Sequence, residues 1–190
     1  MLIIVSGSAG VGKNTVITEI LNTNPNIKLM QTCTTRSPRG TDADMHSPYI
    51  YVTRQDFEDK IKNNELFEHE EIHNNFYGVL NSSLDKVVSR DFHYIKDIGV
   101  LGQINLKRAL KDKVEVLSIF LTAPKEELIK RLKNRGDHDI DLRISRMEFE
   151  LSYSKNYDYV IENIDLEKTI KKVQSLIKKH EKIEQKRFKK

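Results

Sequence analysis

The sequence predicts a three-layer α/β fold, in which a parallel sheet carries helices on both faces. Residues 1–6 are apolar without alternation, which is typical of a strand buried on both sides. A glycine-rich turn follows directly, and strand-like and helix-like segments then alternate along the chain, as they do around parallel sheets. The 190 residues suffice for one domain, and residues 35–80 interrupt the alternation as an inserted lobe.

Apolar spacing and helix-stop residues locate the other elements. A helix over residues 13–23 carries its apolar side chains on one side and ends before Pro25. Thr53 and Asp56 have the spacing of a helix capping box, and residues 74–78 are expected to form a turn. Further strands are expected at 27–32, 49–52, 66–72, 92–98, 114–121 and 159–161, and further helices at 102–111, at 141–154 and after residues 53, 83, 124 and 165.

The composition is that of a globular chain and excludes several classes of protein. No apolar run reaches the ~20 residues of a membrane span, and because a core strand is predicted at residues 1–6, no signal peptide is expected. A single cysteine, Cys33, excludes a disulfide framework and favours the cytoplasm. The net charge of +4 is modest and much of it lies in the basic stretch 178–190, where a solvated helix end is favoured over a nucleic-acid contact.

The turn after the first strand has the layout of a phosphate-binding P-loop, and it departs from the motif only at its last position. Glycines let backbone N–H groups approach a phosphate, the helix that begins near Lys13 favours an anion, and the lysine adds a mobile charge. A glycine-rich turn that binds nothing is disfavoured, because strand, loop, lysine and helix occur in the required order. The expected nucleotide-binding residues are Ser8, Ala9, Gly10, Val11, Gly12, Lys13, Asn14 and Thr15.

Six further motifs occur in the order found in guanylate kinases, and together with the P-loop they make the chain resemble that family over residues 1–177. Each motif alone is weak, whereas six in order are specific. They are TTRSPR at 34–39, YIYV at 49–52, NNELFE at 63–68, NFYG at 75–78, RLKNRG at 131–136 and YDYVIEN at 157–163.

This resemblance implies a P-loop kinase fold that transfers the γ-phosphoryl group of ATP, with Mg²⁺, to GMP or dGMP. The expected partners are these nucleotides, with no membrane and no specific nucleic acid, in a monomer or homodimer. The implied division is a core of residues 1–34, 81–134 and 155–180, a lobe for the nucleoside monophosphate at 35–80, a short lid at 135–150 and the basic tail at 178–190.

The resemblance also implies roles for individual residues. Paired guanidinium groups suit phosphate, and a carboxylate at Glu68 can accept from two N–H groups of guanine. The implied acceptor-binding residues are Thr32, Arg36, Arg39, Tyr49, Glu68, Tyr77 and Asp97. The implied catalytic cations are Lys13, Arg36, Arg131, Arg135 and Arg143. Asn14, Thr15 and Asp97 are the expected metal ligands, and Asn163 is expected beside the adenine of ATP.

Two departures from the family pattern weaken the assignment of the acceptor. Val79 stands where a serine or threonine usually helps to hold guanine. The family's D-x-D at the fourth strand has become Asp97-Ile98-Gly99, so one carboxylate is missing. Two alternatives therefore stay open: a catalytically weakened nucleotide-binding or interaction module, and a kinase for another nucleotide or a phosphorylated sugar.

A competing motif, HEEIH at residues 69–73, matches the H-E-x-x-H pattern of zinc proteases. That pattern requires a helix and a third ligand. Residues 66–72 are predicted as a strand, in which His69 and His73 would lie about 13 Å apart, too far for one metal ion. Solvated residues of the inserted lobe are the favoured interpretation.

Overall fold

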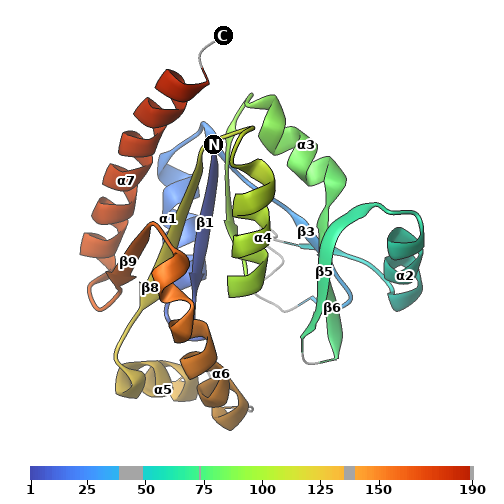
Figure 1. Ribbon diagram of the computed structural model, residues 1–190. Coiled ribbons are helices and arrows are strands. Elements are labelled where there is room, and N and C mark those ends of the chain that lie inside the picture. The colour runs from blue at the N-terminus through green and yellow to red at the C-terminus, as the bar shows by residue number, and fades with distance from the viewer. Residues whose placement is uncertain (39–48, 73, 135–139, 189–190) are drawn as a thin grey trace.

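The computed structural model describes residues 1–38, 49–72, 74–134 and 140–188. A five-stranded parallel sheet forms the centre of the molecule, in the order β2-β7-β1-β8-β9 (Figure 1). Its strands are β1 (Leu2–Gly7), β2 (Ile27–Leu29), β7 (His93–Asp97), β8 (Val116–Thr122) and β9 (Tyr159–Glu162). The predicted three-layer α/β class is confirmed.

Successive side chains of β1 point to opposite faces of the sheet, and different helices cover each face. Ile3 and Val5 pack in a core cluster with side chains of α1 (Lys13–Thr23) and α7 (Leu166–Arg187). Leu2 and Ile4 point to the other face, against α3 (Asn81–Ser89) and α4 (Val100–Leu110). Figure 1 shows these helices on the two sides of the sheet. Because β1 is buried on both faces, its apolar run needs no alternation.

Two further helices extend the first of these core clusters. They are α5 (Lys125–Asn134), which contributes Leu128 and Leu132, and α6 (Ile140–Ser152), which contributes Met147. A short 3-10 turn at Ser154–Asn156 then leads into β9. Among the described residues, no helix combines the length and the apolar character needed to cross a membrane.

A second sheet of four strands stands beside the first, in the order β4-β3-β6-β5. Its strands are β3 (Thr32–Thr34), β4 (Tyr49–Tyr51), β5 (Leu66–Ile72) and β6 (Asn75–Leu80), and it carries α2 (Arg54–Lys62). Phe57 of α2 is fully buried against Cys33 of β3 and Leu80 of β6. This sheet contains the described part of residues 35–80, where the alternation breaks, and also β3, which the predicted division assigned to the core.

The structure corrects two of the predicted elements. Residues 27–32 do not form one strand: the Met30 N–H still bonds to Ile95 of the first sheet, whereas Thr32 begins β3 in the second. Residues 74–78 are not a turn. Only Asn74 has the left-handed backbone of a turn, with φ 60°, and the chain from Asn75 onward pairs with both β5 and β3.

The predicted basic tail is, up to residue 187, the end of the C-terminal helix. α7 continues without a break to Arg187, and its residues His180 and Glu184 are buried. The His180 ring nitrogen Nδ1 lies 2.8 Å from Glu115 Oε1. His180 and Glu184 thus anchor the end of α7, while the basic side chains of this stretch, Lys178, Lys179, Lys182, Lys186 and Arg187, are exposed, as expected for a solvated helix end.

The predicted capping box at the start of α2 is confirmed and predicts a stability effect. Thr53 Oγ1 accepts from the Asp56 N–H at 3.0 Å, and Asp56 Oδ2 accepts from the Thr53 N–H at 3.2 Å. We expect Thr53→Ala to lower the free energy of unfolding by about 1 kcal/mol, measured by urea denaturation. Thr53→Ser, which keeps the hydroxyl, should stay close to the wild type; equal losses in both variants would contradict a capping role.

Candidate active site

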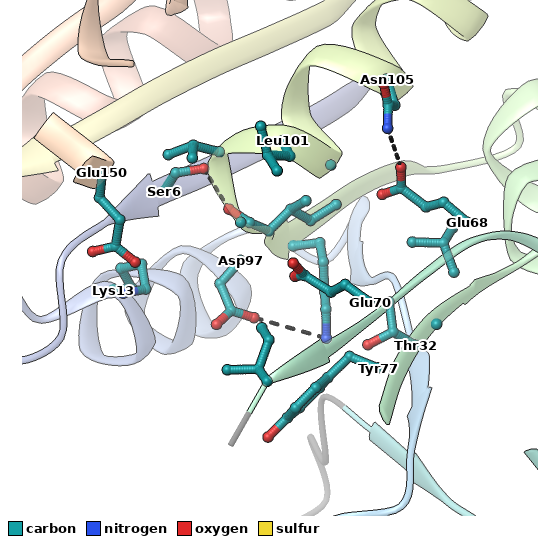
Figure 2. A pocket seen from close by; sticks show the side chains of 18 of the residues that line it. Ser6, Lys13, Thr32, Glu68, Glu70, Tyr77, Asp97, Leu101, Asn105 and Glu150 are labelled. Atoms are coloured by element: carbon teal, nitrogen blue, oxygen red, sulfur yellow. Dashed lines mark hydrogen bonds and ion pairs between the residues drawn. The ribbon is translucent and has the colours of Figure 1, made fainter. Parts of the chain in front are cut away.

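A cavity of about 460 Å³ lies between the two sheets. The first sheet contributes Gly7 of β1 and Asp97 of β7, and the second contributes Tyr49, Glu68 and Tyr77. Helices α4 and α6 add side chains to its wall (Figure 2). The cavity therefore opens at the carboxyl ends of parallel strands, where ligands of α/β proteins gather.

The P-loop forms one end of this cavity. Gly7 has φ 143°, and a Cβ there would come within 2.2 Å of the Leu121 carbonyl oxygen, so only glycine fits between the strands. Gly12 has φ 94° and caps α1 at its N-terminus. Lys13 Nζ donates to the Gly7 carbonyl at 2.6 Å and to that of Ser8 at 3.3 Å. The ammonium thus lies across the mouth of the loop, where it lines the cavity.

Asn163 supports the P-loop from behind. Its side chain is only 4% exposed and donates from Nδ2 to the Val11 carbonyl at 2.7 Å. A Cβ on Gly12 would lie 2.8 Å from the same nitrogen, so the amide packs directly against the loop. In the structure this amide group holds the backbone of the loop, and the place of Asn163 beside adenine stays a prediction.

Arg131, expected at the transferred phosphoryl group, is anchored next to Asn163. Its Nη2 donates to the Asn163 carbonyl at 3.0 Å and its Nε to Glu127 Oε1 at 2.8 Å. Arg131 is not among the residues that line the cavity, whereas Arg143 of α6 is. Arg135 and Arg39 lie outside the described residues.

Three of the expected phosphate-binding side chains cluster on the second sheet. The Tyr49 and Tyr77 rings lie 5.7 Å apart edge to face, and the Arg36 guanidinium carbon lies 5.3 Å from the centre of the Tyr49 ring. Burial raises the pKa of Tyr49, so its phenol stays protonated and can donate. Arg36 Nη2 also donates to the Tyr51 hydroxyl at 3.5 Å.

Lys96 is a cation of the cavity that the sequence analysis missed. It is 1% exposed, and its Nζ lies 4.3 Å from the centre of the Tyr49 ring and 3.7 Å from Asp97 Oδ1. Burial lowers its pKa to about 8. Its strand, β7, mixes polar and apolar residues, and only the fold brings the end of that strand against Tyr49, so no local signal identified Lys96.

Thr32 and Glu68, expected to contact the base, both line the cavity. Glu68 Oε2 accepts from Asn105 Nδ2 of α4 at 2.9 Å, and burial raises the pKa of the Glu68 carboxyl. Val79 belongs to the apolar cluster around Leu2 and offers no hydrogen bond. Asn105 was also missed, because it contacts Glu68 from a distant point of the sequence.

α6 contributes three charged side chains to the same wall. Arg143, Arg146 and Glu150 all line the cavity, and Arg146 Nε lies 3.3 Å from Glu150 Oε1. Of the three, only Arg143 was expected. The spacing of these residues along a helix places them on one side of it.

The three expected metal ligands differ in their position relative to the cavity. Asp97 lines the cavity, whereas Asn14 and Thr15 are exposed on the first turn of α1 and do not line it. Within the described residues, no group of three or more His, Cys, Asp or Glu side chains could hold a metal ion. His69 lies on strand β5, as predicted, rather than on the helix that a zinc protease needs, and His73 is outside the described residues.

Comparisons with known proteins identify one family. A family model described as guanylate kinase matches residues 1–180. The guanylate kinase of Prochlorococcus marinus subsp. pastoris is 38% identical over 182 residues, covering 93% of this chain and 96% of the relative. That of Mycoplasmoides gallisepticum is 36% identical over 187 residues, covering 95% and 93%.

Solved structures give the same result. The crystal structure of guanylate kinase from Anaplasma phagocytophilum has a TM-score of 0.72 at 28% identity, covering 94% of this chain and 84% of that one. A shikimate kinase from Bacteroides thetaiotaomicron has a TM-score of 0.51 at 14% identity, and that likeness concerns the fold alone.

The Asn163–Val11 contact predicts an effect on nucleotide binding. In Asn163→Ala the buried Val11 carbonyl loses its donor and the loop loses its support. We expect ATP affinity, measured by calorimetry, to fall about ten- to a hundredfold. Asn22→Ala, on the exposed side of α1, is the matched control. ATP affinity within twofold of the wild type in Asn163→Ala would contradict this role.

Proposed function

Because the chain belongs to the guanylate kinase family, we propose that it transfers the γ-phosphoryl group of ATP to GMP or dGMP, giving ADP and GDP or dGDP. One observation carries the proposal. Lys13 of the P-loop lines the same cavity as Tyr49, Tyr77 and Glu68 of the second sheet, so a donor and an acceptor can meet within it.

The donor end is suited to a nucleoside triphosphate. Backbone N–H groups of the P-loop and the N-terminus of α1 favour phosphate oxygens, and Lys13 supplies the charge that follows the β- and γ-phosphates. To do so, its ammonium exchanges the carbonyls of Gly7 and Ser8 for phosphate. Asn163 keeps the loop in shape through Val11.

The acceptor end is suited to a purine monophosphate with hydrogen-bond donors on its base. Arg36, Tyr49 and Tyr77 surround the proposed phosphate position, and the buried Lys96 adds a cation beside Tyr49. Glu68 would accept from N1–H and from the exocyclic amine of guanine, with Asn105 holding its second oxygen. We keep Thr32 and Arg39 in the acceptor-binding set.

Transfer of the phosphoryl group requires the two nucleotides to be aligned and needs no covalent intermediate with the protein. An oxygen of the acceptor phosphate attacks the γ-phosphorus while the bond to the β–γ bridging oxygen breaks and ADP leaves. Arg143, which lines the cavity, would stabilise the charge that develops on the transferred group. We assign the same role to Arg131 and Arg135, which would reach the group when the lid closes.

The residues present fit a bound Mg²⁺. This ion is commonly held by one or two carboxylates together with nucleotide phosphates and water, and Asp97 offers a carboxylate at the carboxyl end of β7. Asn14 and Thr15 at the start of α1 are the other proposed ligands. When bound, Mg²⁺ neutralises charge on the β- and γ-phosphates.

We propose that the protein catalyses this reaction in the cytoplasm, where it acts on free nucleotides as a monomer or homodimer. The free, buried Cys33 is consistent with a reducing compartment.

A panel of acceptors tests the proposal. ADP formation from ATP would be measured with GMP, dGMP, AMP, IMP and a phosphorylated sugar in parallel. The proposal expects GMP or dGMP to give the highest kcat/KM. Highest turnover with another acceptor would favour a different kinase, and nucleotide binding without ADP formation would favour a catalytically weakened module.

Lys13 provides the test of the mechanism. Lys13→Ala removes the cation nearest the donor phosphates, so we expect kcat for GMP phosphorylation to fall at least about a hundredfold while the thermal midpoint stays near that of the wild type. Lys86→Ala, on the exposed side of α3, is the control for loss of a lysine. Full activity in Lys13→Ala would overturn the mechanism.

A further inference from the structure

Strand β5 presents two carboxylates, rather than one, to the acceptor cavity. Glu68 and Glu70 are two residues apart, so they share a face of the strand. Both line the cavity and both are about half buried, and Figure 2 shows them directed toward the start of α4. Burial raises the pKa of each carboxyl.

Each carboxylate lies against a glycine of the segment that begins α4. A Cβ on Gly102 would lie 2.6 Å from Glu68 Oε1, and a Cβ on Gly99 would lie 3.2 Å from Glu70 Oε1. Gly99 has φ −61°, which any residue can adopt. Glycine at position 99 is therefore not required by the backbone, and its effect here is to leave room for the Glu70 carboxylate.

The two carboxylates differ in how they are satisfied. Glu68 accepts from Asn105 at 2.9 Å. Glu70 accepts no hydrogen bond from any of the residues that the structure describes. Arg146 attracts it electrostatically, and Glu68 and Glu150 repel it. A half-buried carboxylate that faces a cavity without a donor is suited to a ligand that brings its own N–H group.

We propose that Glu70 reads the exocyclic amine of guanine and replaces, from the opposite wall, the carboxylate that this chain lacks at position 99. The inference deepens the proposed function and rests on it. The amine carries two hydrogens. Glu68 takes N1–H and one of them, and Glu70 takes the other, so that no buried donor of the base is left without an acceptor.

The consequence is discrimination between guanine and hypoxanthine, which lacks the amine. An acceptor that reads only N1–H binds both bases, whereas a carboxylate placed on the amine favours guanine alone. Losing one hydrogen bond to a charged group weakens binding by about ten- to a hundredfold. Glu68 also reads one hydrogen of the amine, so the contribution of Glu70 is the change in the GMP-to-IMP ratio of affinities when Glu70 alone is substituted, and general effects on the phosphate site cancel in that ratio.

The experiment measures dissociation constants of GMP and IMP by calorimetry for the wild type and for Glu70→Gln, which is nearly isosteric. We expect GMP binding to weaken about ten- to a hundredfold and IMP binding to change by less than threefold. Glu71→Gln, the neighbouring exposed residue of β5, is the matched control and should leave both constants unchanged. Equal losses for GMP and IMP, or no loss at all, would overturn the assignment.

A second variant tests the exchange of position directly. Glu70→Ala combined with Gly99→Asp returns a carboxylate to position 99 once Glu70 no longer occupies the space, and aspartate is also a favoured residue at a helix N-cap. We expect the pair to recover the part of the GMP-over-IMP preference that Glu70→Ala alone loses, Glu68 supplying the remainder. No recovery in a double variant that melts like the wild type would contradict the exchange.

Binding and turnover keep the two proposals separable. A flat GMP-to-IMP ratio in Glu70→Gln, with a wild type that phosphorylates GMP, removes only the role of Glu70. The opposite outcome is also distinct. If the wild type binds GMP more tightly than IMP, if Glu70→Gln weakens this preference, and if no GDP ever forms, then the role of Glu70 stands and the proposed transfer is wrong.

Discussion

The central strand β1 is the constraint on which the rest of the structure depends. Its residues are buried, and it pairs in parallel with β7 on one side and β8 on the other. The register sets Val5 opposite Asp97 and Gly7 opposite Leu121, so the phosphate loop and the acidic strand end emerge at one edge. A slip of one residue would turn Ile3 and Val5 toward the wrong helices and separate these groups.

The cavity at this edge carries both signs of charge rather than a uniformly basic wall. Phosphates need cations, whereas the N–H groups of a base need acceptors, and a site for both must keep the two apart. Lys96 lies beside the tyrosine cluster of the second sheet, while Glu68 and Glu70 face α4. Because buried charges are weakly screened, such an arrangement favours one orientation of an acceptor in the proposed site. The described charged lining consists of Lys13, Lys96, Arg143, Arg146, Glu68, Glu70, Asp97 and Glu150.

Local signals in the sequence were sufficient for most elements and for the donor end of the site. The apolar run of β1, the P-loop and the Thr53 capping box depend on neighbouring residues, and all were predicted at the places where they occur. The prediction was wrong where pairing is long-range: residues 27–34 divide between two sheets, and β6 pairs with strands on both sides. Lys96 was missed because only the fold reveals that its strand end faces Tyr49.

The contact between Gly102 and Glu68 lets a residue of α4 determine where the Glu68 carboxylate lies in the cavity wall. The missing side chain at position 102 leaves Glu68 the space it occupies, since a Cβ would stand 2.6 Å from its oxygen. In the proposed reading of guanine by Glu68, residue 102 of α4 thus affects the position of the reading carboxylate without itself contacting the base. A side chain at position 102 would displace the Glu68 carboxylate, so the presence of the glutamate alone is an incomplete guide to the shape of this wall.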